Sequence, residues 1–353
     1  MTSELSNFAA RLRESIRSGF QGEDFDALAL ELFGLQFENN FAYRRICEAR
    51  GRTPEAVEYW AQIPAVPTGA FKELKLTSLA SGERTAVFHS SGTTEQKSSR
   101  HFHSAESLVL YEASLWKWFQ LHFGNAGELV FLTPNQEAAP HSSLIHMFET
   151  VRRKVGAHEM AFAGKISSDG AWALDFAATI AALNGKSKSK TQNPKLIFGT
   201  AFSFVHLLDY LAQNNLRLQL PEGSRVMETG GYKNRSRSMP KTELHSLITK
   251  LLGVPRENII CEYGMSELSS QAYVTASGKF QFPPWSRVQI ISSETGREVA
   301  EGETGLIRVF DLANVFSVAA IQTEDLGVRR GEGFELIGRA QLAEPRGCSL
   351  MTA

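Results

Sequence analysis

The chain has 353 residues, 42% of them hydrophobic, and a formal net charge of −1. This length supplies enough apolar surface for one large domain or two ordinary ones. A nearly neutral chain lacks the global field that gathers nucleic acid or an anionic membrane, so we expect neither as a partner.

Cysteine usage and targeting signals favour a cytoplasmic protein. The three cysteines, Cys47, Cys261 and Cys348, are odd in number and widely spaced, which indicates neither a disulfide framework nor a zinc site. Cys47 and Cys261 fall in an expected helix and strand as small buried residues. The N-terminus lacks a basic region followed by an apolar run, and no stretch is long and apolar enough for membrane insertion.

The first 60 residues carry apolar side chains at helical spacing, as at Leu28, Leu32 and Phe33. From about 85 to 265, short apolar runs alternate with longer amphipathic stretches, which predicts an α/β fold with a largely parallel sheet. The expected strands are 85–89, 128–133, 157–163, 195–199, 225–229 and 258–263. The expected helices are 104–122, 141–154, 171–183, 201–214 and 240–252.

After residue 270 the pattern is of short strands with glycine-containing turns, which predicts a small β-rich subdomain. Its expected strands are 273–275, 287–292, 305–310, 318–322 and 334–338. The polar and basic segment 184–194 is expected to be a surface loop. We divide the chain into an N-terminal helical part (1–67), an α/β core (68–270), the β-rich part (271–339) and a flexible tail (340–353).

The segment 89–98, His-Ser-Ser-Gly-Thr-Thr-Glu-Gln-Lys-Ser, follows an expected strand and precedes an expected helix. Strand, Gly- and hydroxyl-rich loop and helix in this order are typical of a phosphate cradle. Gly92 lets backbone approach the anion, and Lys97 supplies positive charge. Hydroxyl donors are supplied by Ser90, Ser91, Thr93 and Thr94. The Walker A spacing is absent, and the alternative is an ordinary Ser/Thr-rich turn.

Three further segments follow in order: 228–233 (Glu-Thr-Gly-Gly-Tyr-Lys), 262–267 (Glu-Tyr-Gly-Met-Ser-Glu), and 323–327 (Thr-Glu-Asp-Leu-Gly) with Gly338-Arg339 after it. With the loop at 89–98, this ordered set resembles the adenylate-forming superfamily of acyl-CoA synthetases, luciferases and peptide-synthetase adenylation domains. The phrases Ser-Ser-Gly-Thr-Thr and Glu-Tyr-Gly-Met-Ser-Glu-Leu, and the tail Arg-Gly-Cys-Ser-Leu, are similar to its acyl-protein synthetase branch, which includes the bacterial bioluminescence synthetase.

The resemblance implies an α/β fold like the N-terminal domain of that superfamily, with layered sheets flanked by helices. It also implies ATP and Mg²⁺ as cofactors. The mobile C-terminal domain of the superfamily, with its lysine, is expected to be absent, because the chain ends soon after Arg339. Two residues depart from the superfamily pattern: Glu95 replaces a common glycine, and Glu324 is the middle residue of the Thr-Gly-Asp-type motif.

The resemblance also implies roles for individual residues. The triphosphate would be held by Ser90, Ser91, Gly92, Thr93, Thr94 and Lys97. Adenine would lie against Gly230, Gly231 and Tyr232, with Tyr263 stacked nearby in the motif that continues through Gly264, Met265 and Ser266. Glu267 would help to hold Mg²⁺, Asp325 would accept from the ribose hydroxyls, and Arg339 would sit at the ribose or phosphate end.

The first reaction would be attack of a carboxylate on the α-phosphorus of ATP, which needs positioning and charge neutralisation rather than a general base. Candidate cations at the α-phosphate are Lys233, Arg235 and Arg237; the alternative is a solvated basic turn. His141 is a candidate for the acyl pocket or for a structural role in equal measure. His146 is expected to pack on its helix, and His101 and His103 to be surface residues.

Cys348 occupies the place where acyl-protein synthetases carry an acyl-accepting cysteine, and the alternative is an idle tail residue. We expect a ligase that passes its acyl group to Cys348 and onward to an acyl reductase or acyl-carrier partner. A CoA or carrier-protein ligase and an inactive nucleotide-binding scaffold are the alternatives. The sequence does not choose between a fatty and an aryl acid, and it leaves the oligomeric state open.

Overall fold

The computed structural model describes residues 3–90, 97–124, 127–156, 160–168, 170–184, 193–232, 236–274 and 278–340. The α-helices are α1 (Ser3–Ser18), α2 (Phe25–Asn39), α3 (Phe41–Ala49), α4 (Ala70–Glu73), α5 (Ala105–Phe123), α6 (Ser143–Val155), α7 (Phe176–Asn184), α8 (Ala201–Gln213) and α9 (Lys241–Leu252). Short 3₁₀ turns are η1 (Pro54–Ala56), η2 (Trp60–Gln62), η3 (Ser81–Glu83) and η4 (Arg256–Asn258).

The first eight strands are β1 (Val66–Pro67), β2 (Ala86–His89), β3 (Arg100–His103), β4 (Glu128–Phe131), β5 (Met160–Phe162), β6 (Gly164–Ile166), β7 (Trp172–Leu174) and β8 (Lys195–Thr200). The others are β9 (Arg225–Thr229), β10 (Ile259–Tyr263), β11 (Ala272–Val274), β12 (Phe280–Gln281), β13 (Ser286–Ile291), β14 (Thr304–Asp311), β15 (Ala320–Arg330) and β16 (Gly333–Arg339). None of the described helices combines the length and the apolarity needed to cross a bilayer.

Twelve strands of the described chain form one sheet, in the order β13-β14-β15-β16-β12-β11-β10-β9-β8-β4-β5, with β1 paired to β15. The run from β5 to β10 is parallel, and β11 reverses the direction. The expected α/β class with a parallel sheet and a β-rich continuation is therefore confirmed. The boundaries proposed at residues 67, 270 and 339 stay predictions.

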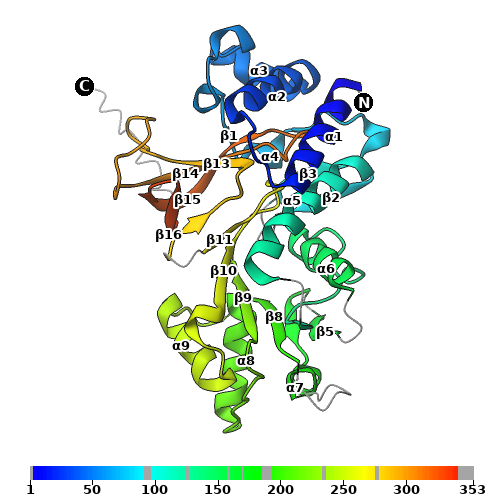
Figure 1. Ribbon diagram of the computed structural model, residues 1–353, viewed down its shortest axis with the longest axis vertical. Helices are drawn as coiled ribbons and strands as arrows, with labels where there is room; N and C mark the ends of the chain where they lie inside the picture. The colour runs from blue at the N-terminus through cyan, green and yellow to red at the C-terminus, as the bar shows by residue number, and fades with distance from the viewer. Residues whose placement is uncertain are drawn as a thin grey trace, which may run out of the picture.

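The parallel strands are buried on both faces, and their side chains alternate between two cores. On one face, Val130 and Ile197 pack in a cluster with α8 and α9, including Leu208 and Ile248. On the other, neighbouring residues such as Phe131 and Phe198 pack in a cluster with α5 and α6. Side chains of a strand point alternately to its two faces, so continuous apolar runs supply both layers. Figure 1 shows α8 and α9 beside the lower end of this sheet.

The antiparallel strands are covered by the N-terminal helices. A third cluster joins residues of α1, α2 and α3, such as Phe8, Phe33 and Tyr43, to Trp285 and Ile307 beside and within β13–β14. In Figure 1 the blue helices α2 and α3 lie above the orange strands β13–β15. The N-terminal residues therefore complete the core of the C-terminal strands, which are more than 200 positions away in the sequence.

Several sequence expectations for these elements are wrong. The strand at 85–89 does not join the parallel sheet: β2 pairs antiparallel with β3 in a separate hairpin. The loop at 89–98 is therefore followed by a strand, and α5 starts only at Ala105, after the N-cap Ser104. The pattern of β3 was missed because its two inward-facing residues are histidines, His101 and His103, which are both buried.

Two other boundaries also move. The helix expected over 171–183 begins at Phe176, because Trp172–Leu174 pair with β6 and the carboxylate of Asp175 accepts from the backbone N–H of Ala178. Such a side-chain acceptor satisfies a free N–H at the start of a helix. The strand expected over 318–322 runs on to Arg330 as β15, so the segment 323–327 is strand rather than turn.

The buried carboxylate of Asp311, at the end of β14, holds the segment that follows β10. It accepts five hydrogen bonds from described donors: the backbone N–H groups of Ser269, Ser270 and Ala313, and the hydroxyls of Ser270 and Ser286, at 2.7–3.1 Å. Burial raises the pKa of Asp311, whereas these bonds favour its ionised form. The carboxylate thus joins the parallel and antiparallel halves of the sheet.

We expect Asp311→Ala to lower the free energy of unfolding by about 3 kcal/mol, because several buried donors lose their acceptor at once. Urea denaturation followed by circular dichroism measures the change. The control is Asp209→Ala, which removes an ion pair to Arg237 that is part-exposed on both sides; its effect should stay below about 1 kcal/mol. Equal effects of the two substitutions would contradict the role given to Asp311.

Candidate active site

Glu267 lies at the centre of a buried cluster of oxygen atoms. Its carboxylate accepts hydrogen bonds from the hydroxyls of Ser99 and Ser266, the second at 2.9 Å. The Ser99 and Ser266 hydroxyls are themselves 3.4 Å apart. All three side chains are nearly inaccessible to solvent. The cluster joins the base of the loop at 89–98 to the segment after β10, two of the four motifs found in the sequence.

His101 contacts the backbone of this cluster. Its Nδ1 lies 2.8 Å from the carbonyl oxygen of Ser266, and burial lowers its pKa to about 4. The ring of His103 is next to it, with ring centroids 4.3 Å apart, and burial holds the pKa of His103 well below its usual value. The expectation that both were surface residues is wrong. Both rings are neutral packing elements at pH 7.

The base of the loop at 89–98 is closed by Ser90. Its hydroxyl accepts from the backbone N–H of Ser99 at 3.0 Å, which leaves its own O–H proton able to donate. His141 stacks on His89 with ring centroids 4.9 Å apart, and its Nδ1 lies 3.2 Å from the Val87 carbonyl oxygen. The structure therefore places His141 at the root of the loop, before α6 rather than in its first turn.

Lys97 is paired with Glu73 of α4 at 2.8 Å, and both side chains are more than half exposed. An exposed pair of this kind contributes little free energy, so the ammonium can exchange partners at small cost.

The remaining loop residues expected at the triphosphate lie outside the described residues: Ser91, Gly92, Thr93 and Thr94. Lys233, Arg235 and Cys348 also lie outside them. Arg237 binds Asp209 and Glu243 in ion pairs, which favours the solvated-turn alternative for it.

The paired glycines follow directly after β9. Gly230 has a φ of +66°, a left-handed conformation that favours glycine, and a Cβ atom on Gly230 or Gly231 would meet open space. Tyr232 donates its hydroxyl to the Met239 carbonyl oxygen at 2.8 Å, and its ring packs beside α8 and α9.

Glu262 ties the ends of β9 and β10 together. Its carboxylate accepts the hydroxyl of Thr229, which lies opposite it in the parallel register. Burial raises the pKa of Glu262 to about 7. A Cβ atom on Gly264 would approach the Glu262 carboxylate to 2.4 Å, so a larger residue here would have to displace that carboxylate. The contact between Thr229 and Glu262 was not predicted from the sequence, although both residues belong to predicted motifs, 228–233 and 262–267.

Tyr263 at the end of β10, Asp325 in the middle of β15 and Arg339 at the end of β16 lie close together. The Tyr263 hydroxyl donates to Asp325 at 2.9 Å, and Arg339 lies 3.6 Å from the other carboxylate oxygen. Asp325 and Arg339 are also register partners of β15 and β16. Burial raises the pKa of Asp325, opposed by the Tyr263 hydroxyl and Arg339. Tyr263 itself is buried against the rings of Phe280 and Phe334, and Met265 packs beside the same core.

The four motifs are therefore connected by direct contacts. Ser99 at the loop base contacts Glu267, Thr229 contacts Glu262, and Tyr263 contacts Asp325, which pairs with Arg339. Ser99 was not among the predicted residues; its hydroxyl next to the loop was the available signal.

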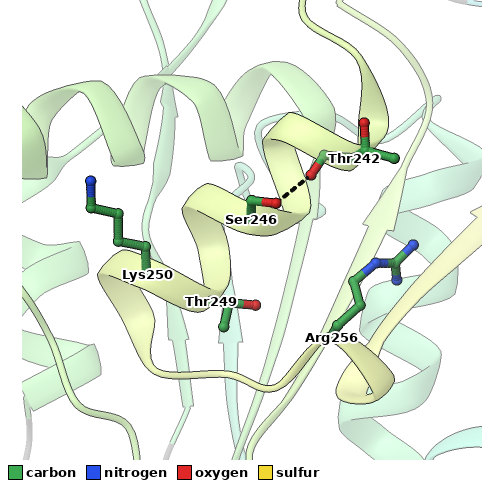
Figure 2. Close-up of a pocket in the computed structure, with 5 residues that line it drawn as sticks. All are labelled: Thr242, Ser246, Thr249, Lys250 and Arg256. Carbon is green, nitrogen blue, oxygen red and sulfur yellow. Dashed lines mark hydrogen bonds between the residues drawn. The ribbon is translucent and has the colours of Figure 1, made fainter.

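A separate pocket on α9 and η4, shown in Figure 2, is lined by none of the predicted residues. Its lining is Thr242, Ser246, Thr249, Lys250 and Arg256.

Solved structures with the same fold are adenylate-forming ligases. An open conformation of 2-hydroxyisobutyryl-CoA ligase, solved with 2-HIB-AMP and CoA, superposes with a TM-score of 0.67 at 13% identity, covering 89% of this chain and 73% of the other. ATP-bound MatB from Rhodopseudomonas palustris gives a TM-score of 0.51 at 14% identity, over 85% of this chain and 58% of that one. The chain thus has the fold of adenylate-forming ligases.

Residues 20–353 match the family described as acyl-protein synthetase, LuxE, and the chain belongs to that family. It is similar to a long-chain-fatty-acid–luciferin-component ligase of Aliivibrio fischeri, with 25% identity over 94% of this chain and 89% of the relative. A protein of the same name from Vibrio harveyi is 25% identical over 89% of this chain and 83% of its own length. The chain is an acid–thiol ligase that activates its acid as an acyl-adenylate and then transfers the acyl group.

Two buried tyrosines test the contact between Tyr263 and Asp325. We expect Tyr263→Phe to lower the free energy of unfolding by about 1–2 kcal/mol, because Asp325 loses a buried donor. Tyr273→Phe is the matched control, since the buried hydroxyl of Tyr273 has no partner among the described residues. Its removal should be neutral or stabilising. Thermal and urea unfolding of both variants measure the difference, and a costlier Tyr273→Phe would contradict the hydrogen bond as the cause.

Proposed function

We propose that this enzyme activates a fatty acid with ATP and Mg²⁺ at the site around Glu267, Tyr263 and Asp325, and that Cys348 then accepts the acyl group. The observation that carries the proposal is the set of contacts that joins all four motifs. The names of the two curated relatives support a long-chain fatty acid as the substrate.

Asp325 is the proposed ribose acceptor. Tyr263 donates to one of its oxygens and Arg339 lies near the other, so the carboxylate is fixed in position before the nucleotide arrives. A carboxylate has several acceptor sites, and two donors leave some of them for the ribose hydroxyls. Arg339 is 75% exposed and can reach a phosphate or ribose oxygen. The adjoining turn at Gly230 and Gly231 is the proposed place for adenine.

The donor atoms around Glu267 fit Mg²⁺, which prefers carboxylate and hydroxyl oxygen together with substrate phosphates. Glu267 would hold the ion, with Ser99 and Ser266 orienting its carboxylate. When bound, Mg²⁺ offsets the charge that develops on the leaving pyrophosphate. The loop at 89–98 begins and ends beside this cluster, because Ser90 contacts Ser99. This proximity supports the loop residues and Lys97 as the proposed phosphate-binding group.

In the first half-reaction a carboxylate oxygen of the acid attacks the α-phosphorus, a C(O)O–P bond forms, and the bond to pyrophosphate breaks. The acid is already ionised at pH 7, so no proton has to be removed. The protein contributes alignment and charge neutralisation, which are the main sources of catalysis in such displacements. In the proposed assignment, Lys97 and Lys233 supply charge at the phosphates, and His141 at the loop root borders the acid.

In the second half-reaction the thiolate of Cys348 attacks the carbonyl carbon of the adenylate. A C–S bond forms, the C–O bond to AMP breaks, and the thiol proton leaves to solvent. Cys47 and Cys261 are unsuited to this step, because both are buried and burial raises the pKa values of their thiols to about 11 and about 12. An acyl reductase or a carrier protein is the proposed recipient of the thioester.

ATP–pyrophosphate exchange tests the first half-reaction across fatty, aryl and amino acids. We expect exchange with fatty acids, with Glu267→Gln raising the Mg²⁺ concentration for half-maximal rate by about tenfold, because one charged ligand is lost. Glu335→Gln, at an exposed site on β16, should leave that concentration unchanged. No exchange with any acid, despite AMP binding, would contradict the proposal and support an inactive scaffold.

Labelled acid and ATP test the second half-reaction on the full chain. We expect Cys348→Ser to lose the acyl–protein label by at least tenfold while keeping ATP–pyrophosphate exchange, because the adenylate still forms. Cys47→Ser, the control, should keep the label. If Cys348→Ser transfers the acyl group to CoA or a carrier as fast as the parent, the acceptor is external and Cys348 is not the thioester site.

A further inference from the structure

Three buried side chains of the kinds that bind transition metals meet between β9, β10 and α9. They are Glu228, Cys261 and His245, with exposed fractions of 0%, 4% and 1%. The Cys261 sulfur lies 3.2 Å from Glu228 Oε2, His245 Nε2 lies 3.6 Å from the same oxygen, and sulfur and nitrogen are 3.6 Å apart. The three ligand atoms therefore form a nearly equilateral triangle.

The size of this triangle matches one face of a zinc tetrahedron. With Zn–S of about 2.3 Å and Zn–N and Zn–O of about 2.0–2.2 Å, tetrahedral angles place the ligand atoms about 3.4–3.6 Å from each other. The observed separations of 3.2, 3.6 and 3.6 Å need shifts of only a few tenths of an ångström. Thiolate, imidazole and carboxylate are also the donor types that Zn²⁺ binds in proteins.

The cluster is not satisfied by hydrogen bonds alone. Glu228 Oε1 and His245 Nδ1 are both buried without a hydrogen-bond partner among the described residues. Buried polar atoms of proteins are nearly always paired, so both side chains lack an ordinary partner at these atoms; neither unpaired atom is one of the three ligand atoms of the triangle, which are Cys261 Sγ, Glu228 Oε2 and His245 Nε2. Glu228 and Cys261 are register partners whose side chains contact His245 of α9. Their neighbours Thr229 and Glu262 point to the opposite face of the sheet.

Charge balance explains how the cluster can exist with and without a metal. The ammonium of Lys241, one helical turn before His245, lies 3.4 Å from Glu228 Oε2 and offsets its charge. Burial opposes ionisation of Glu228, but hydrogen bonds and charges from His245 and Lys241 lower its pKa overall. The Lys241 side chain is 42% exposed and can turn outward to solvent. Zn²⁺ with the Cys261 thiolate brings the same net charge of +1 to Glu228.

We propose that Glu228, His245 and Cys261 bind Zn²⁺, with a water molecule as fourth ligand, and that Lys241 holds the place of the metal charge in the metal-free protein. Binding deprotonates the Cys261 thiol: an S–Zn bond forms and the proton passes to solvent. The metal would cross-link two strands of the parallel sheet to α9, just below the turn at Gly230. Its role would be structural, because all three ligand side chains are buried in the core.

Co²⁺ is the probe, because its tetrahedral thiolate complexes absorb in the visible range and show a sulfur-to-metal charge-transfer band in the near ultraviolet. The full-length protein is titrated with Co²⁺ at pH 7.5 and then with Zn²⁺. We expect one equivalent of Co²⁺ to produce both bands and Zn²⁺ to displace it. Cys261→Ser should abolish the charge-transfer band, whereas Cys47→Ser and Cys348→Ser, the matched controls, should retain it.

Two further variants separate binding from folding. His245→Gln should weaken metal affinity by more than about tenfold, since even the loss of an outer-shell partner costs 10–100-fold. Lys241→Met should strengthen it, because a competing cation is removed. Circular dichroism establishes that each variant is folded. The proposal is overturned if the parent protein binds no Co²⁺ or Zn²⁺ at micromolar concentrations, or if the bands survive in folded Cys261→Ser.

Discussion

The carboxylate of Asp311 is fully buried. Its burial is possible because backbone N–H groups of Ser269 and Ser270 and the hydroxyl of Ser286 donate hydrogen bonds to it. It fixes Ser269 and Ser270, while its neighbour Asn314 binds the Glu267 carbonyl oxygen and the Ser269 hydroxyl. The segment that carries Glu267 is therefore held from the far side of the sheet. A buried acid with several donors rigidifies such a segment more than apolar packing would.

The rest of the candidate site repeats this arrangement on a smaller scale. Three motif carboxylates accept a hydroxyl from another element: Glu267 from Ser99, Glu262 from Thr229 and Asp325 from Tyr263. Activation of an already ionised acid requires no base, so the task of the protein is to keep charged groups in place around the phosphates. Preformed hydroxyl–carboxylate contacts reduce the reorganisation needed when the nucleotide binds.

The two strands at the centre of the site serve two faces of the sheet. Along β9 and β10, Thr229 and Glu262 lie on one face of the sheet, whereas Glu228 and Cys261 lie on the other face, toward α9. Neighbouring residues of one motif therefore have different tasks. A substitution at Glu228 changes the contacts of β9 with α9 just before the Gly230 turn. A substitution at Glu262 changes the contact that joins the ends of β9 and β10.

The sequence by itself determined the fold class, most helices and strands, and the order of four motifs, because apolar periodicity and glycine positions are local signals. It did not determine that β2 lies outside the parallel sheet. The partner strand β3 was not predicted, because its two buried residues are histidines rather than apolar residues. The contacts of Ser99 with Glu267 and of Tyr263 with Asp325 join residues 168 and 62 positions apart, which spacing cannot reveal.

Cysteine spacing likewise gives no indication of zinc, because spacing reports only ligands that are close together in sequence. Only the tertiary structure brings Cys261 to Glu228 and His245, by setting two parallel strands side by side and laying α9 across them. Metal ligands and buried charges interact through space at a few ångströms. Their meeting is decided by register and helix packing, which depend on the whole core rather than on any one segment.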